Sequence, residues 1–252
     1  TDHASAITWA ASSPSSALLW GCQLGFYNGA FNPPTLAHMH IARRVASLVD
    51  YLWLDPEPAT AHKQHFMDES LNERVQMCES AISEFQLQSK IGVGTLRSDM
   101  GRVAGESATL FRTLRALVGP AGRIYWAVGA DVASGMRFWK DKAEECTQPE
   151  ETCDGLLVFQ RAGADMEQLQ AALSGLRCPV EVLDMPSHLL DASSHNARQA
   201  LLRAASHGGC AAKPNNTCDE VMLRSVSQYC LSQPRLLEMY QAQLRELRSD
   251  RC

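Results

Sequence analysis

The alternation of short apolar runs with helical segments is the feature that most constrains how this chain folds. Strand-like and helix-like patterns take turns along the sequence from about residue 20 onward. Such alternation favours a parallel sheet with helices on both faces. We therefore predict an α/β fold: a Rossmann-like, doubly wound parallel sheet followed by C-terminal helices.

The spacing of apolar residues predicts where these elements lie. Strands are expected over residues 22–27, 51–54, 91–96, 124–128, 156–159 and 180–183. Helices are expected over residues 36–49, 71–85, 107–118, 193–205, 218–231 and 235–248. We interpret residues 1–20 as a loose leader and residues 21–252 as one domain, whose helical part begins near residue 193. Two loops look like insertions, at residues 144–154 and 208–217.

Charge and hydropathy narrow the kinds of ligand that we expect. The net charge is −5 at pH 7, and no stripe of Lys and Arg runs along the sequence. Duplex binding needs clustered positive charge, so we expect no nucleic acid as the main ligand. No stretch approaches the length of a membrane helix, so we expect no membrane partner.

The nine cysteines indicate a reducing compartment. Their spacing is irregular and contains no CxxC pair, so we interpret the thiols as reduced and the protein as cytoplasmic, with a nuclear or other organelle address left open. Disulfides across small loops, Cys146 with Cys153 and Cys210 with Cys218, remain alternatives.

Three short polar clusters fall where strands give way to helices, which is where parallel sheets bind ligands. The first is the turn GAFNPPTLAH at residues 29–38. Gly29 lets backbone approach a phosphate closely, and Asn32 is biased toward extended geometry by the proline that follows it. His38 lies in the first turn of a helix, where an anion is favoured, so its ring can donate to a phosphate. The alternative is a histidine that only caps or packs.

The second cluster is LLDASSHNAR at residues 189–198. Ser193 or Ser194 can cap the helix that starts there. Ser194 and Arg198 are four residues apart, so both side chains lie on one helix face and suit a phosphate. The alternative is an ordinary helix cap with a surface arginine.

The third cluster is the GAD segment that ends a strand at residues 129–131, with Trp139 following. Asp131 at the end of a strand can accept hydrogen bonds from ribose hydroxyls, or it can cap the next helix. Trp139 either recognises a ligand or belongs to the core.

In this order, the three clusters resemble the nicotinamide/nicotinate mononucleotide adenylyltransferases of the HxGH nucleotidyltransferase superfamily. FNPPTLAH resembles the first motif of that family, FNPxTxxH, and GAD with its tryptophan resembles the GAD…W segment. DASSHNAR resembles DISSTxxR, although His195 stands where the family has threonine. Weaker matches are His62-Lys63 after the second strand and Arg161 after the fifth.

The resemblance implies that ATP and a pyridine mononucleotide react to give a dinucleotide and pyrophosphate by direct in-line attack. The implied ATP-binding residues are Gly29, Ala30, Phe31, Asn32, Thr35, His38, Gly129, Asp131, Ser193, Ser194 and Arg198. Of these, His38 and Arg198 would be catalytic. The implied mononucleotide-binding residues are Lys63, Trp139 and Arg161. The only cofactor implied is Mg²⁺, carried on the triphosphate with water, because no carboxylate cluster offers a dedicated site.

Several alternatives stay open at this point. The chain can be another transferase of the same superfamily, of the phosphopantetheine or cytidylyl type, although Trp139 argues against this. It can also be a degenerate, non-catalytic nucleotide-binding module, since His195 and the reduced first motif depart from the pattern. The choice between the amide and the acid mononucleotide, and the formation of homo-oligomers, are likewise open.

Overall fold

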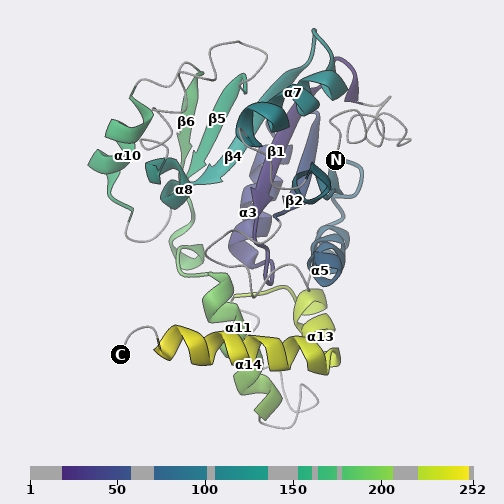
Figure 1. The fold of residues 1–252 in the computed structure, drawn as a ribbon, viewed down its shortest axis with the longest axis vertical. Helices are drawn as coiled ribbons and strands as arrows, with labels where there is room; N and C mark the ends of the chain where they lie inside the picture. The colour runs from purple at the N-terminus through teal and green to yellow at the C-terminus, as the bar shows by residue number, and fades with distance from the viewer. Residues whose placement is uncertain are drawn as a thin grey trace. The chain divides into compact units, whose positions relative to one another are not determined.

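A computed structural model shows the fold and describes residues 19–57, 71–100, 106–135, 153–160, 164–174, 178–206 and 221–249 (Figure 1). Its contacts divide the chain into two compact units that interleave along the sequence. The sheet unit takes its described residues from Thr1–Asn28, Ile41–Asp55 and Lys90–Met185. The helical unit takes its described residues from Gly29–His40, Pro56–Ser89 and Pro186–Cys252.

A six-stranded parallel sheet forms the centre of the sheet unit, with the strand order β3-β2-β1-β4-β5-β6 (Figure 1). The strands are β1 Gln23–Gly29, β2 Tyr51–Pro56, β3 Ile91–Val93, β4 Arg123–Gly129, β5 Gly155–Phe159 and β6 Val180–Leu183. The order steps outward from β1 in both directions, which is the doubly wound arrangement. The predicted fold class is confirmed.

Helices pack on both faces of this sheet because alternate residues of a strand point to opposite sides. Leu24 and Phe26 of β1 belong to the same buried cluster as Phe111 of α7. The Phe111 ring packs edge-on against the Trp126 ring of β4, with ring centroids 5.3 Å apart. Gly25, between those two β1 residues, instead approaches α3.

The helices of the fold are α3 Leu36–Ala46, α5 Leu71–Glu84, α6 Leu96–Met100, α7 Glu106–Val118, α8 Ala130–Gly135, α10 Met166–Leu173, α11 Ser194–Ser206, α13 Arg224–Ser232 and α14 Pro234–Ser249, with a short 3-10 turn η4 at Ser187–Leu189.

The structure corrects several expected boundaries. The strand expected over residues 91–96 ends at Val93, because the Thr95 hydroxyl bonds the Asp99 carboxylate at 2.9 Å and starts α6. The helix expected over residues 218–231 begins at Arg224 in the part of that range that the structure describes. The short helices α6, α8 and α10 were not expected.

Four helices pack together in the helical unit: α5, α11, α13 and α14. Figure 1 shows α14 laid across α11 and α13. Tyr240 of α14 is fully buried, and burial raises the pKa of its phenol well above the ordinary value. Among the described helices, none has the length and apolar character needed to cross a membrane.

Close approach of α3 to the sheet depends on Gly25. A β-carbon added there would lie 2.8 Å from Cγ1 of Val45 and 3.1 Å from Cδ1 of Leu52. We predict that Gly25→Ala lowers the free energy of unfolding by about 1–3 kcal/mol through overpacking. Urea unfolding measures this loss. Adding Val45→Ala in the same chain should make the cost of Gly25→Ala smaller, and equal stability of Gly25→Ala and the wild type would contradict the prediction.

Candidate functional site

The turn between β1 and α3, residues 30–35, is here called the proline turn. Pro33 and Pro34 have no N–H group, so this turn offers more hydrogen-bond acceptors than donors. Its Phe31 is buried with φ at 45°, and the ring packs edge-on against the His38 ring with centroids 5.2 Å apart. Because the turn is largely buried, its carbonyl groups need donors from elsewhere in the protein.

Arg74 of α5 supplies one of these hydrogen bonds and a second one to a neighbouring chain segment. Its Nη1 donates to the carbonyl oxygens of Ala30 at 2.9 Å and Glu57 at 2.8 Å. The Glu57 amide in turn donates to the Gly29 carbonyl at 2.9 Å. Arg74 is fully buried, so the guanidinium joins the two chain segments from inside the helical unit.

Sequence reasoning missed Arg74, although a signal was present. Arg74 shares the buried face of α5 with Met77, Cys78 and Ala81, which follow it at helical spacing. An arginine in line with an apolar stripe is unusual, because charged side chains are rarely fully buried unless they are paired. The position of Arg74 in this stripe therefore indicates that its guanidinium forms a buried polar contact.

The start of α11 binds the same turn. Nη1 of Arg198 donates to the Asn32 carbonyl at 2.6 Å, and the Ser194 hydroxyl donates to the Pro33 carbonyl at 2.9 Å. The spacing of four residues places both side chains toward the turn, as the sequence predicted for one helix face. The first and second motifs therefore meet in the helical unit.

Ser193 is the residue that caps α11, since its hydroxyl accepts from the Asn196 amide at 3.2 Å. His195 contacts Gln199 one turn later, with the two Nε2 atoms 2.9 Å apart. Arg198 is mostly buried, and this burial lowers the pKa of its guanidinium. Its Nε is also buried and makes no hydrogen bond within the protein. Arg198 is thus not the surface arginine of an ordinary helix cap.

His38 and Thr35 are hydrogen-bonded to each other at the start of α3. The Thr35 amide donates to Nδ1 of His38 at 3.0 Å, and the Thr35 hydroxyl donates to the Ala192 carbonyl at 2.8 Å. This is a capping box in which histidine takes the position usual for Glu or Gln. Since Nδ1 accepts from the amide, the neutral ring carries its proton on Nε2. Nε2 is therefore the atom through which His38 can donate to a phosphate.

The protein itself uses part of the expected anion site. The Leu36 amide at the helix start donates to the Val221 carbonyl at 2.9 Å. A β-carbon at Gly29 would lie 3.3 Å from Cζ of Phe31, so this glycine makes room for the Phe31 ring. The Leu36 amide, at the start of the helix, is therefore already used in a hydrogen bond within the protein.

Gly129 and Asp131 belong to the sheet unit. Gly129 is buried and ends β4, the neighbour of β1 in the sheet. Asp131 is exposed in the first turn of α8, as its second residue, so it does not cap that helix. Nearby on the same strand, Nε1 of Trp126 donates to Oδ1 of Asn28 at 2.7 Å. The Asp131 carboxylate therefore follows the carboxyl end of β4, where the strand order switches between β1 and β4. Ligands bind at this switch point in such sheets.

The three residues expected to bind the mononucleotide, Lys63, Trp139 and Arg161, lie outside the described residues. The same holds for residues 208–217 and for most of residues 144–154. Their roles stay predictions. Of the two disulfide alternatives, only Cys153 is described, and it is a free thiol.

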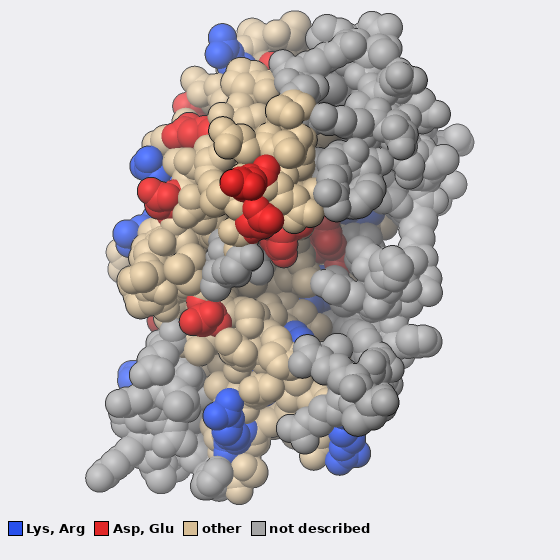
Figure 2. Space-filling model, turned by 90° about the vertical axis from the view of Figure 1, so that its left-hand side faces the viewer, with Lys and Arg blue, Asp and Glu red and all other residues tan. Residues whose placement is uncertain are grey.

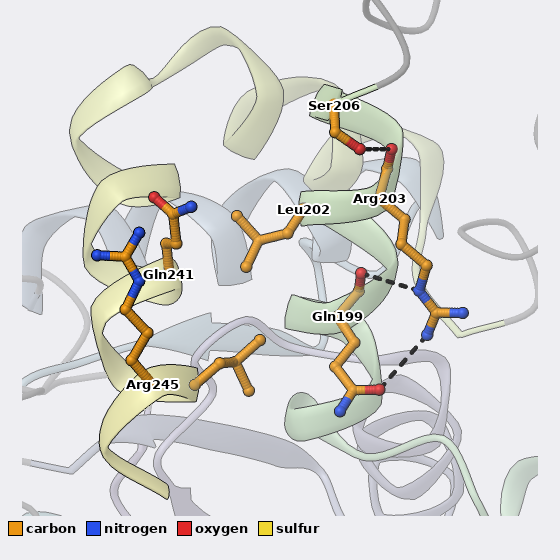
Figure 3. Close-up of a pocket in the computed structure, with 7 residues that line it drawn as sticks. Gln199, Leu202, Arg203, Ser206, Gln241 and Arg245 are labelled. Atoms are coloured by element: carbon orange, nitrogen blue, oxygen red, sulfur yellow. Dashed lines mark hydrogen bonds between the residues drawn. The ribbon is translucent and has the colours of Figure 1, made fainter. Parts of the chain in front are cut away.

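A hollow of about 590 Å³ lies between α11 and α14 (Figure 3). It is lined by Gln199, Leu202, Arg203, Ser206, Gln241, Leu244 and Arg245, and none of these is a predicted site residue. Arg203 bonds the Gln199 side chain at 3.4 Å within this hollow. On the face in Figure 2, the described Lys and Arg side chains lie apart, and Asp and Glu side chains lie among them in the upper part.

Comparisons with known proteins agree with the motifs. The profile of the cytidylyltransferase-like family matches residues 26–154. A protein of Methylorubrum extorquens (strain PA1) named "Probable nicotinate-nucleotide adenylyltransferase" is 26% identical over 186 residues, which is 72% of this chain and 80% of that protein. Proteins of the same name from Geobacillus kaustophilus (strain HTA426) and Geobacter sp. (strain M21) are 27% and 30% identical over 46% and 48% of this chain. The chain spans about half the length of these two, 53% and 55%.

A solved structure shares the fold. It is the nicotinic acid mononucleotide adenylyltransferase of Plasmodium falciparum complexed with APC, which is 17% identical with a TM-score of 0.61. The match covers 84% of this chain and 95% of that one. The resemblance seen in the sequence is thereby confirmed at the level of family and fold.

The Thr35 hydroxyl should matter for stability. We predict that Thr35→Val lowers the free energy of unfolding by about 1–3 kcal/mol, because the Ala192 carbonyl loses its buried donor. Thr35→Ser, which keeps the hydroxyl, should cost less. Thr113→Val is a matched control, since the buried Thr113 hydroxyl bonds only the Thr109 carbonyl of its own helix. Urea unfolding compares the three, and a loss for Thr35→Val no larger than for Thr113→Val would contradict the prediction.

Proposed function

Since this chain belongs to the cytidylyltransferase-like family, we propose that it transfers the adenylyl group of ATP to nicotinamide or nicotinate mononucleotide. The products would be a pyridine dinucleotide and pyrophosphate. The observation that supports this proposal most is a histidine whose Nδ1 accepts from the Thr35 amide, beside a turn whose carbonyls are bound by Arg74 and Arg198. The names of the curated relatives support the choice of ATP and a pyridine mononucleotide within the family.

The reaction is a displacement at the α-phosphorus of ATP. An oxygen of the acceptor's 5′-phosphate forms the new bond to that phosphorus, and the bond to the bridging oxygen of the β-phosphate breaks. The acceptor phosphate is already ionised near neutral pH, so no general base is needed. Positioning and neutralisation of charge then supply the rate enhancement.

His38 is the proposed donor to the phosphate at which charge develops. Its Nδ1 is held by the Thr35 amide, so the direction of the Nε2–H bond is set before substrate binds. A preorganised donor needs no reorientation during the reaction, which is the source of its effect.

Arg198 and Ser194 are proposed to act mainly through the turn. The resemblance assigns them to the β- and γ-phosphates, but both already donate to turn carbonyls. Arg198 keeps further N–H groups and its full charge, so it can also attract the triphosphate. For Ser194 we propose a positioning role.

The remaining assignments follow from the resemblance. Asp131 would accept hydrogen bonds from a ribose, with Gly129 allowing close approach at the strand end. Lys63, Trp139 and Arg161 would bind the mononucleotide. Magnesium would supply charge neutralisation on the triphosphate. Within the described part of the chain, no three His, Cys, Asp or Glu side chains gather to hold a metal ion.

An assay of pyrophosphate release tests the proposed function. Purified protein is given ATP or CTP, with Mg²⁺, and with nicotinate mononucleotide, nicotinamide mononucleotide or 4′-phosphopantetheine as acceptor. We expect release only with ATP and a pyridine mononucleotide, with one dinucleotide per pyrophosphate. Release with CTP or with phosphopantetheine would identify another transferase of the superfamily, and no release with any pair would identify a non-catalytic binding module.

Two substitutions at His38 separate its capping role from its catalytic role. The amide oxygen of Asn can take the place of Nδ1, so His38→Asn should stay folded while kcat falls by about a hundredfold or more through loss of the Nε2 donor. His38→Gln should lose stability but keep more activity, because its amide nitrogen lies nearer the Nε2 position. His40→Ala on the same helix is the control. A near-normal kcat of His38→Asn would show that His38 is not a catalytic residue.

Trp139 should recognise the pyridine ring. An electron-poor ring over the indole face gains roughly 0.5–2 kcal/mol. We predict that Trp139→Ala raises KM for the mononucleotide about tenfold and leaves KM for ATP little changed. Equal losses for both substrates, together with a lower melting temperature, would instead show a core tryptophan.

A further inference from the structure

Two cysteines meet at the amino ends of neighbouring strands in the sheet unit. Strands β5 and β6 are parallel, with Leu156 paired to Val180. Cys153 lies just before β5 and Cys178 just before β6. Their Sγ atoms are 3.8 Å apart, and the Cys153 thiol donates to the Cys178 sulfur. A sulfur–sulfur bond is about 2.0 Å long, so a small local approach would join them.

The two thiols differ in a way that suits a nucleophile and a resolving partner. Cys153 is buried, whereas Cys178 is half-buried and open to solvent. The hydrogen bond from Cys153 lowers the pKa of Cys178, while the same contact and burial raise the pKa of Cys153. The nearby Asp154 carboxylate opposes the stabilisation of the Cys178 thiolate but does not reverse it. Thiolate character and access are what make a cysteine reactive.

The other described thiols lack this combination. Cys22 is half-buried like Cys178, but burial and the Asp50 carboxylate raise its pKa. Cys78 is fully buried, and burial raises its pKa strongly. Cys22 is therefore a matched control, since it has similar access without the lowered pKa.

We propose that Cys153 and Cys178 are a redox-active pair that forms a reversible disulfide between β5 and β6. The oxidant is a small-molecule disulfide such as oxidised glutathione. The Cys178 thiolate attacks one of its sulfurs, which forms a mixed disulfide and releases one glutathione thiolate. Cys153 then gives up its proton and attacks the Cys178 sulfur, which forms the protein disulfide and releases the second glutathione thiolate. Two protein thiols are thus oxidised, and one glutathione disulfide is reduced to two thiols.

The disulfide would attach the edge strand β6 covalently to the end of β5. Strand β6 is the last strand and has only four residues, of which Glu181 and Val182 are exposed. The β5 side is already anchored, because Oδ2 of Asp154 accepts from Nη2 of Arg115 at 2.6 Å and from the Ile124 amide at 2.7 Å. A disulfide would give β6 a covalent attachment to this anchored end, in addition to its hydrogen bonds with β5.

A peptide map without reduction tests the cross-link directly. The full chain with Cys146→Ser is incubated in a glutathione redox buffer and digested with trypsin, so that Cys153 is alone in the peptide of residues 143–161 and Cys178 alone in residues 178–198. We expect these two peptides to be joined in the oxidised sample and separated by a reductant. A map in which both cysteines stay reduced, or in which Cys178 pairs elsewhere, overturns the proposal.

Two variants test the order of the steps. Cys153→Ser should accumulate one glutathionyl group on Cys178, at least tenfold faster than glutathionylation at Cys22. Cys178→Ser should leave Cys153 unmodified. Equal rates at Cys178 and Cys22 would overturn the assignment of the nucleophile. If either variant fails to fold, hydrogen exchange of the Cys146→Ser chain tests the proposal instead. Amides of β6 should exchange about tenfold more slowly after oxidation. Unchanged exchange would overturn the proposed disulfide between β5 and β6.

Discussion

Buried carbonyl groups in the proline turn are the constraint on which the helical unit depends. Two prolines remove donors from this turn but leave its acceptors in place, and a buried acceptor without a donor is costly. Arg74, Ser194 and Arg198 supply those donors from two helices that are far apart in sequence. Positions of α5 and α11 are thereby tied to one short stretch of backbone.

This constraint also explains why polar residues that resemble phosphate ligands turn out to bind backbone. The turn proposed to direct a phosphate needs a single conformation, and side chains that bind its carbonyls set that conformation. The contact between Thr35 and His38 extends the same principle to a side chain, because it fixes which ring nitrogen carries the proton. Phosphoryl and nucleotidyl transfers rely on such fixed donors more than on a reactive nucleophile.

Much of this fold could be predicted from the sequence, because apolar periodicity is strong in its strands and longer helices. All six strands begin within two residues of where the pattern placed them, although β3 has only half its expected length. Helices α6, α8 and α10 escaped prediction, since segments of five to eight residues hold too few turns to show a period. Arg74 escaped for a different reason: its partners, Ala30 and Glu57, are distant in sequence, and only the folded chain brings them together. The Ser194 and Arg198 pair was placed correctly on one helix face, yet its carbonyl partners could not be foreseen.

The nitrogen chemical shifts of the His38 ring test the central claim most directly. Protein labelled with ¹⁵N-histidine is observed by long-range proton–nitrogen correlation, before and after addition of a non-hydrolysable ATP analogue with Mg²⁺. We predict that Nδ1 is bare and Nε2 protonated in the free protein, and that the analogue shifts the Nε2 resonance of His38 while that of His40 stays in place. A protonated Nδ1 in the neutral ring, or an unshifted His38 with the analogue at saturation, would contradict the account.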